Sequence, residues 1–241
     1  PKAMNSLNGD ICAALEEYLP RIEQDDSVRV LVITGTGPAF CAGADLKEIV
    51  GGLDLPPGEP DLLDRMGDGV FADLRDFPKP VIAALNGVTM AGGLELAMCC
   101  DLVVAAEEAV IADAHANFGV YPGAGGAAVL PRLVPANVAK YLLLTGKTLS
   151  AQEMQQYGFV NEVVPSADLV KATTELAELI AVKSPAALRR MKAVANATSD
   201  KSRDAALEHE QVHFRKHMRS YDLAEGLAAF REKRAPEFKG Y

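Results

Sequence analysis

The sequence predicts an α/β protein that ends in a region built only of helices. Two observations lead to this prediction. Short apolar, β-branched runs alternate with helix-like segments as far as Val164, and beyond about Ser166 only helix-like segments remain. Strands that are apolar throughout are typical of a sheet covered on both faces by helices. The second observation indicates a separate helical region that begins near residue 170.

Composition and charge narrow the class of protein. A chain of 241 residues with 49% hydrophobic and 24% charged residues can bury one substantial core and is not disordered in composition. The net charge of −9 argues against a nucleic-acid partner, which would need clustered Lys and Arg. No apolar run is long enough to span a bilayer. The four cysteines lack metal-ligand spacing, which favours reduced thiols and a cytoplasmic location.

The first half of the chain divides into alternating helices and strands. A helical stripe of apolar residues runs from Asn5 to about Ile22, and the run 29–34 predicts a buried strand. Gly and Pro are frequent in 51–60, which predicts a surface loop, and 62–74 looks helical. The following elements are predicted as a strand at 80–85, a helix at 91–99 and a strand at 101–105.

The second half predicts the helical region. Its four helices are expected at about 167–183, 185–197, 202–219 and 221–233. We therefore divide the chain into an α/β core, residues 1–170, and a helical C-terminal region, residues 171–241. The helices of this region carry more apolar residues than a small appendage can bury, which is typical of subunit association.

Two loop-to-helix junctions carry small residues where a ligand could approach the backbone. One is Ala39–Lys47, after the strand at 29–34, and the other is Ala91–Leu96, after the strand at 80–85. Free N–H groups at a helix N-terminus point outward with the positive end of the helix dipole behind them. Two such junctions on neighbouring strands could aim two donors at one oxyanion, worth about 3–4 kcal/mol per donor. Each glycine cluster taken alone is only a tight turn.

Taken together, these junctions and other segments resemble the enoyl-CoA hydratase/isomerase (crotonase) family. The resemblance covers essentially the whole chain, in order and at the family's spacing. The segments that carry it are Pro1–Leu7, Ala39–Lys47, Pro80–Gly87, Ala91–Ala97, Cys100–Ala105, Pro122–Gly126, Leu144–Gly146, Ala151–Met154 and Glu225–Arg234.

The resemblance implies a fold and an assembly. The fold is a crotonase-like spiral of ββα turns, followed by a C-terminal helical region that builds trimers, commonly paired into hexamers. In that family a strand or hairpin precedes the segment that matches Pro1–Leu7, so the core, residues 1–170, is expected to lack this opening strand.

The resemblance also implies how an acyl-CoA thioester binds. The N–H groups of Ala44 and Gly92 are expected to hold the thioester oxygen. Coenzyme A is part of the substrate, and no other cofactor and no metal are expected. The residues that the resemblance assigns to CoA are Ala42, Asp45, Leu46 and Lys47 near its adenine and phosphates, and Phe214, Phe230 and Lys233, the last two toward the ligand of a neighbouring subunit.

The acid/base pair departs from the family pattern. Family hydratases use two glutamates, and Glu95 matches the first of them. The second position falls on His115, whose imidazole titrates near neutrality and can give or take a proton. Asp113 lies two residues earlier and, in an extended segment, would share a face with His115, where it could orient the imidazole or act in its place.

These residues leave several reactions open. Hydration of a 2-enoyl-CoA is the leading hypothesis, with Glu95 activating water and His115 protonating C2. Isomerisation or C–C hydrolysis of an acyl-CoA is the alternative within the family, because the second acid/base position is where members differ. A scaffold or RNA-binding role without catalysis is disfavoured by the acidic charge and by the retention of Ala44, Gly92 and Glu95.

One motif suggests an unrelated activity. The segment His209-Glu210-x-x-His213 matches the H-E-x-x-H pattern of zinc metalloproteases, and His217 continues the same helical row. Short patterns of this kind also match by chance, and three consecutive helical turns are poor geometry for three ligands of one tetrahedral ion. Zinc proteolysis is therefore a distant alternative. The segment Gly123–Gly126 lacks the spacing and the βαβ setting of a dinucleotide site.

Overall fold

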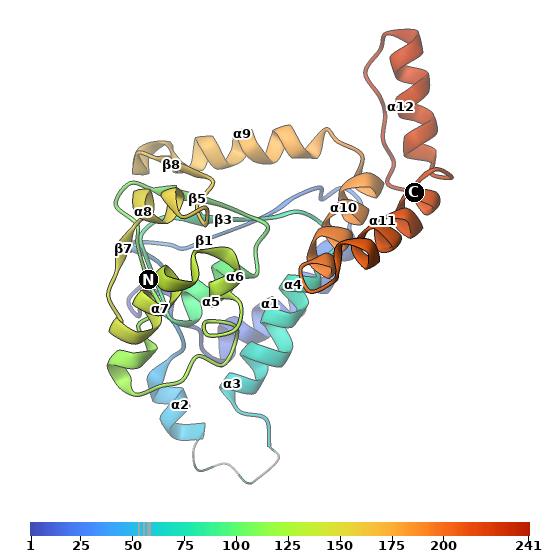
Figure 1. Ribbon diagram of the computed structural model, residues 1–241. Coiled ribbons are helices and arrows are strands. Elements are labelled where there is room, and N and C mark those ends of the chain that lie inside the picture. The colour runs from blue at the N-terminus through green and yellow to red at the C-terminus, as the bar shows by residue number, and fades with distance from the viewer. Residues whose placement is uncertain (53, 55, 57–58) are drawn as a thin grey trace.

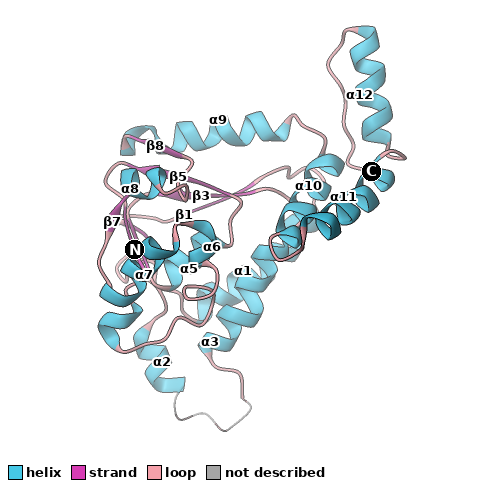
Figure 2. Cartoon of the chain, viewed as in Figure 1, coloured by secondary structure: helices cyan, strands magenta, loops and turns pink. Residues whose placement is uncertain are grey.

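The computed structural model describes residues 1–52, 54, 56 and 59–241, and its core holds two four-stranded sheets (Figures 1 and 2). The first is parallel and has the order β1 (Leu31–Thr34), β3 (Val81–Leu85), β5 (Leu102–Ala106) and β8 (Glu162–Val164). The second has the order β2 (Ala39–Cys41), β4 (Val88–Met90), β6 (Val110–Ala112) and β7 (Leu149–Ser150), with β7 antiparallel. Successive chain turns give one strand to each sheet, which confirms the predicted spiral.

Helices connect and cover these sheets. The segment predicted as one helix at 62–74 is helical throughout, but its middle, Arg65–Val70, is a π-helix. In the N-terminal part the helices are α1 (Gly9–Gln24), α2 (Leu46–Gly52), α3 (Leu62–Asp64), α4 (Phe71–Asp76) and α5 (Gly92–Met98). The remaining helices are α6 (Leu130–Leu133), α7 (Ala136–Thr145), α8 (Ala151–Gln156), α9 (Leu169–Ala181), α10 (Pro185–Thr198), α11 (Arg203–His217) and α12 (Tyr221–Glu232).

Several predicted boundaries differ from the observed ones, among them the start of the first helix and the start of the loop 51–60. The first helix begins at Gly9 and not at Asn5, because the Asn8 side chain accepts a hydrogen bond from the Ile11 N–H and so caps the helix there. The predicted loop 51–60 begins later than expected, since Gly51 and Gly52 end α2. Within that loop, residues 53, 55, 57 and 58 lie outside the described residues.

The central strand β3 shows why the sequence is apolar without alternation. Its residues Val81, Ala83 and Leu85 belong to the main core between the sheets and the N-terminal helices. Ile82 and Ala84 point the other way, into a smaller core beneath α9. Both faces of the strand are therefore buried, which explains why this run has no polar residues.

No helix of the described residues is long and apolar enough to cross a membrane.

The helices α11 and α12 and the tail after them, residues 203–241, form an arm that extends away from the core. Figure 1 shows α12 projecting away from the sheets, and Figure 2 shows only helices and loops in this part. No residue of α11 is buried, and α12 buries only Asp222 and Ala229. The predicted helical region is therefore confirmed, and within the chain the arm has almost no hydrophobic core of its own.

A buried carboxylate, Asp222, ties this arm together. Its Oδ2 accepts hydrogen bonds from Ser184 Oγ at 2.6 Å and from the Ala186 N–H at 3.3 Å, at the start of α10. Its Oδ1 accepts the N–H groups of Lys239 at 2.7 Å and Gly240 at 3.0 Å, in the C-terminal tail. Burial acts to raise the pKa of Asp222, but these four hydrogen bonds outweigh it and lower the pKa below its usual value.

We expect Asp222→Asn to lower the free energy of unfolding by about 1–3 kcal/mol near neutral pH, because the variant replaces an ionised acceptor of four hydrogen bonds. A carboxylate with a lowered pKa stabilises the fold above its unfolded pKa and loses this effect as the pH falls through its folded pKa. Urea unfolding at several pH values should thus show the two proteins converging at acidic pH. Asp73→Asn, at an exposed position, is the control, and a difference that does not vary with pH would contradict this account of Asp222.

Candidate active site

A cavity of about 480 Å³ opens beside the two predicted loop-to-helix junctions. Its walls come from the N-terminal segment, the start of α2, the π-helical segment, the β4–α5 junction and the loop after β6. Most of the predicted site residues contribute to its lining, namely Ala42, Ala44, Asp45, Leu46, Lys47, Gly92, Glu95 and His115. The structure therefore brings the two junctions together, as the sequence predicted.

The two expected oxyanion donors are neighbours. A Cβ placed on Gly92 would lie 3.4 Å from the Ala44 nitrogen, and one placed on Gly43 would lie 3.3 Å from the Gly92 nitrogen. The adjacent N–H groups of Ala42 and Asp45 donate to backbone carbonyls of the N-terminal segment. Among the hydrogen bonds of the described residues, the N–H groups of Ala44 and Gly92 have no acceptor. Both are thus available to one oxygen atom.

A strained turn presents the second donor. Ala91, between β4 and α5, has φ 50° and ψ −120°, a conformation that side-chain-bearing residues rarely adopt and that costs about 1–3 kcal/mol. Its N–H donates to the Ala112 carbonyl at the end of β6, and its carbonyl accepts the Glu95 N–H of α5. Hydrogen bonds on both sides of Ala91 therefore fix the conformation of the turn. Gly93 is required next to it because a Cβ there would lie 2.1 Å from the Cys41 carbonyl oxygen. The strain is located where a functional turn is expected.

Glu95 is buried on α5, with 2% of its surface exposed, and its carboxylate is held in place. Its Oε1 accepts hydrogen bonds from the N–H groups of Ala124 at 2.9 Å and Gly126 at 3.0 Å. Its Oε2 faces His115 Nε2 at 3.9 Å. Glu95 was predicted from the sequence, but the two N–H donors were not. The small residues of Pro122–Gly126 were a visible signal, but their partner could not be read from the sequence.

His115 and Asp113 also meet, but not in the way expected. His115 Nδ1 lies 3.0 Å from Asp113 Oδ1. The segment is not extended, because Ala114 between them is left-handed, with φ 59°, and His115 begins a short 3₁₀ helix. The condition under which the two residues would share a face, an extended segment, is therefore not met. The left-handed residue folds the chain back so that the imidazole reaches the carboxylate.

The surroundings of His115 favour its charged form. Burial acts to lower the pKa of His115, but the hydrogen bond to Asp113, the charge of Asp113 and the charge of Glu95 together raise it above its usual value. Asp113 itself is 1% exposed and does not line the cavity. Its Oδ2 is buried and has no hydrogen-bond partner among the described residues, and a Cβ on Gly126 would lie 2.6 Å from it. Asp113 therefore touches the imidazole but does not face the cavity.

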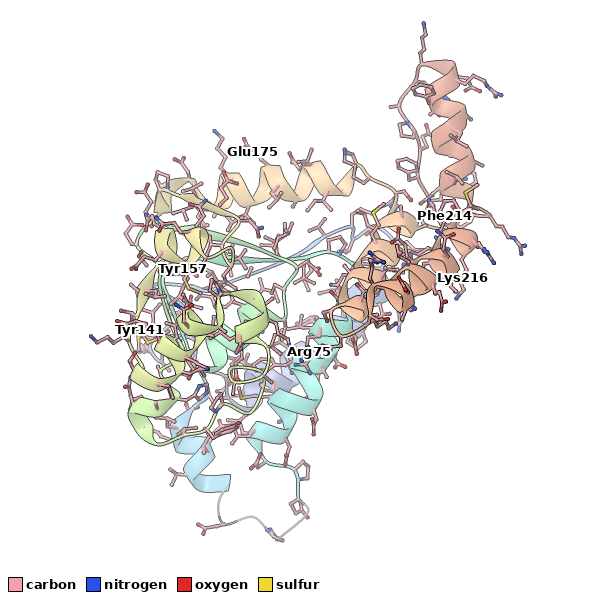
Figure 3. The ribbon with its side chains drawn as sticks, viewed as in Figure 1. Arg75, Tyr141, Tyr157, Glu175, Phe214 and Lys216 are labelled. Atoms are coloured by element: carbon pink, nitrogen blue, oxygen red, sulfur yellow. The ribbon has the colours of Figure 1, made fainter. Side chains whose placement is uncertain are left out.

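The three C-terminal residues assigned to CoA lie elsewhere. Phe214, on α11, and Phe230, on α12, are exposed by 52% and 86%, and Figure 3 shows Phe214 on the arm. Lys233 follows α12 in a left-handed conformation and is also exposed. None of the three lines the cavity of its own chain.

The histidine row on α11 does not form a metal centre with other side chains that the structure describes. The rings of His209 and His213 lie 4.8 Å apart, whereas His217 Nδ1 lies beside Arg190 at 3.1 Å and Ser220 Oγ at 3.3 Å. Burial lowers the pKa of His213, and the neighbouring His209 and positive charges, those of Lys216, Arg190 and Lys201, lower it further. No group of three or more His, Cys, Asp or Glu side chains among the described residues could hold a metal ion. This arrangement does not support the zinc-protease alternative.

Comparison with known proteins decides the family. The family model described as enoyl-CoA hydratase/isomerase matches residues 1–241. The chain belongs to this family. Among enoyl-CoA hydratase/isomerase relatives it is similar to the crotonyl-CoA hydratase of Syntrophomonas wolfei, with 38% identity over 99% of this chain and 91% of the relative. It is also similar to the 1,2-epoxyphenylacetyl-CoA isomerase of Escherichia coli, with 35% identity over 100% of this chain and 92% of the relative.

Solved structures of the enoyl-CoA hydratase/isomerase family confirm the predicted crotonase-type fold. The enoyl-CoA hydratase from Bacillus anthracis superimposes with a TM-score of 0.92 at 36% identity, covering 100% of this chain and 92% of that one. At this identity and coverage the likeness extends to the whole spiral and to the C-terminal helices.

Proposed function

We propose that this enzyme hydrates 2-enoyl-CoA thioesters. The observation that carries the proposal is the placement of Glu95 and His115 on one side of a cavity whose wall also holds the free N–H groups of Ala44 and Gly92. An α,β-unsaturated thioester accepts a nucleophile at C3 only if the negative charge that develops on the thioester oxygen is stabilised. Two preorganised N–H donors supply that stabilisation.

The two facing side chains divide the proton transfers. Glu95 Oε2 takes a proton from water while the water oxygen bonds to C3, and the electron pair of the double bond moves into the enolate. His115 Nε2 then gives its proton to C2 as the enolate collapses. The facing atoms are 3.9 Å apart, too far for a direct hydrogen bond, and a water shared between them can return the proton from Glu95 to His115. Asp113 holds the imidazole so that Nε2 faces Glu95.

Isomerisation is the second candidate, and one observation favours it. Glu95 is the only carboxylate of the pair Glu95 and Asp113 that lines the cavity, whereas family hydratases use two. A single carboxylate and an imidazole can remove a proton from one carbon and return it to another without water. Hydrolysis of a C–C bond uses the same groups with a different substrate. The reactions share the oxyanion donors. In hydration and in hydrolysis Glu95 deprotonates water, which attacks C3 or a carbonyl carbon, whereas in isomerisation it deprotonates a carbon of the substrate.

A panel of CoA thioesters tests the reaction. We expect crotonyl-CoA to be converted to its 3-hydroxy product, and free crotonate to bind at least about 100-fold more weakly, since most binding energy comes from the CoA part. Product analysis by NMR in deuterated water separates water addition, double-bond migration and cleavage. Migration of a 3-enoyl-CoA double bond without any water addition would replace hydration by isomerisation. Equal affinity for the acid and its thioester would contradict the CoA assignment.

The predicted CoA contacts need an assembly to act. We propose that residues 171–241 associate the chains into a trimer or a hexamer, which would bring Phe230 and Lys233 to a neighbouring subunit's ligand. The apolar side chains exposed on the arm support this assembly, since Met218 is 52% and Leu227 is 63% exposed.

We also propose a cytoplasmic location, which is supported by the four cysteines, all of them free thiols.

Light scattering tests the assembly. We expect three or six times the mass of one chain at micromolar concentration, and a smaller species for Leu227→Glu, because a charge would be buried in the contact. Leu144→Glu, at a position on α7 that is 78% exposed and outside the arm, should keep the wild-type mass. A monomeric wild-type protein across this concentration range would rule the assembly out.

A further inference from the structure

A small crevice away from the active site is lined by apolar residues and by five basic side chains. Its walls come from the segments that lead into β1 and β3, from the turn between α9 and α10, and from the C-terminal tail. Figure 1 shows the tail returning from α12 to end near α10 and α11. The crevice shares no lining residue with the active-site cavity. The crevice is therefore a site separate from the active-site cavity.

Five cations and one carboxylate, Asp26, line this crevice. The cations are Arg29, Lys79, Lys183, Arg189 and Lys239. None of the five lies within 4.0 Å of a carboxylate oxygen among the described residues. In a chain with 33 acidic and 24 basic residues, such a concentration of unpaired positive charge is not explained by composition.

The partners of these cations orient them without neutralising them. Lys79 Nζ donates to the carbonyls of Ile22 at 2.7 Å and Asp25 at 2.6 Å. Arg29 donates to the Phe238 carbonyl at 3.0 Å, and Arg189 to the Gly240 carbonyl at 3.2 Å. A carbonyl oxygen satisfies one N–H group and leaves the positive charge in place, with other N–H groups still able to donate.

The remaining two cations have no acceptor among these carbonyls. Lys239 Nζ lies 4.8 Å from the centre of the Tyr221 ring. Lys183 is exposed and forms no hydrogen bond or ion pair with its side chain among the described residues. Both ammonium groups are therefore able to donate to a ligand that enters the crevice.

We propose that this crevice binds a phosphate group, with Arg189, Lys183 and Lys239 as its principal donors. The crevice has a volume of about 30 Å³, which is space for about two water molecules when one needs 10–15 Å³. A space of this size suits the oxygens of a single phosphate and excludes the ring system of a nucleotide. Charge-assisted hydrogen bonds from Arg and Lys are the usual way in which proteins hold phosphate.

Binding there would fasten the C-terminal tail to the core. Arg29 and Lys79 belong to segments that enter the sheet, whereas Lys239 belongs to the tail that Asp222 anchors. A phosphate between them bridges both parts, and any ligand that binds only the folded protein raises its stability. Inorganic phosphate should thus raise the melting temperature more than chloride does at the same ionic strength.

Calorimetry with inorganic phosphate and with glycerol 3-phosphate tests this site on the 241-residue chain. We expect Lys183→Glu and Arg189→Gln each to weaken binding at least about tenfold and to remove the phosphate-specific gain in melting temperature. Lys171→Glu, on α9 but outside the crevice, should leave both unchanged. Tighter binding of the inorganic ion would identify a free phosphate as the ligand, and tighter binding of the ester would identify a larger phosphorylated molecule. Equal binding by wild type and both crevice variants, or no binding at all, would overturn the proposal.

Discussion

Glu95→Gln is expected to lower kcat for hydration of crotonyl-CoA by about 10²–10⁴, the usual contribution of a positioned general base. The amide keeps the shape of the carboxylate, and its oxygen can still accept the N–H groups of Ala124 and Gly126. The fold and the CoA affinity should therefore change little. Steady-state kinetics and calorimetry with a CoA thioester measure the two quantities separately.

The control for this variant is Glu178→Gln, at an exposed position on α9. It removes the same charge from the chain and should leave kcat unchanged. A kcat for Glu95→Gln within a factor of about ten of the wild type would remove Glu95 from the role of base. A large rise in KM with an unchanged kcat would instead indicate that Glu95 only binds the substrate.

His115→Gln is expected to lower the hydration rate by about 10²–10³, because glutamine cannot supply a proton to C2. The wild-type rate should fall as the pH rises through the pKa of His115, since only the protonated imidazole is an acid. Asp113 is one cause of the raised pKa. Asp113→Asn should consequently shift this alkaline decline to lower pH. Rate–pH profiles of the wild type and the two variants measure this. If His115→Gln has no effect while Asp113→Asn abolishes hydration, the proton donor is not His115.

The contact between His115 and Asp113 also changes what a glutamate at position 115 would do. From the sequence alone, His115→Glu is expected to restore the family's pair of glutamates and preserve hydration. In the structure the new carboxylate would lie beside buried Asp113, and two like charges at such a distance disfavour ionisation. Because the donor to C2 must be protonated, we expect the double variant Asp113→Asn/His115→Glu to hydrate more slowly than His115→Glu alone, in the same assay.

The sequence by itself determined the strands β1, β3 and β5, the helices of the C-terminal region and the two donor junctions. The strand β3 was predicted because a strand buried on both faces carries only apolar residues. Such a run can be recognised within a short stretch of sequence. The helix that begins at Gly92 was found because small residues at a helix start are also a local signal. Glu95 was singled out because a carboxylate between apolar residues requires a reason, and the segment's resemblance to the family provided one.

Only the tertiary structure decided how these parts act on one another. The N–H donors of Glu95 come from Ala124 and Gly126, about thirty positions along the chain, and no local pattern links them. The meeting of His115 with Asp113 depends on a left-handed Ala114, a conformation that an alanine in the sequence does not indicate. The basic crevice gathers five cations from segments as far apart as Arg29 and Lys239, and their charges add only because folding places them together. Local propensity is set by neighbours in sequence, whereas a site is set by distances in space, which is why the elements could be predicted and these contacts could not.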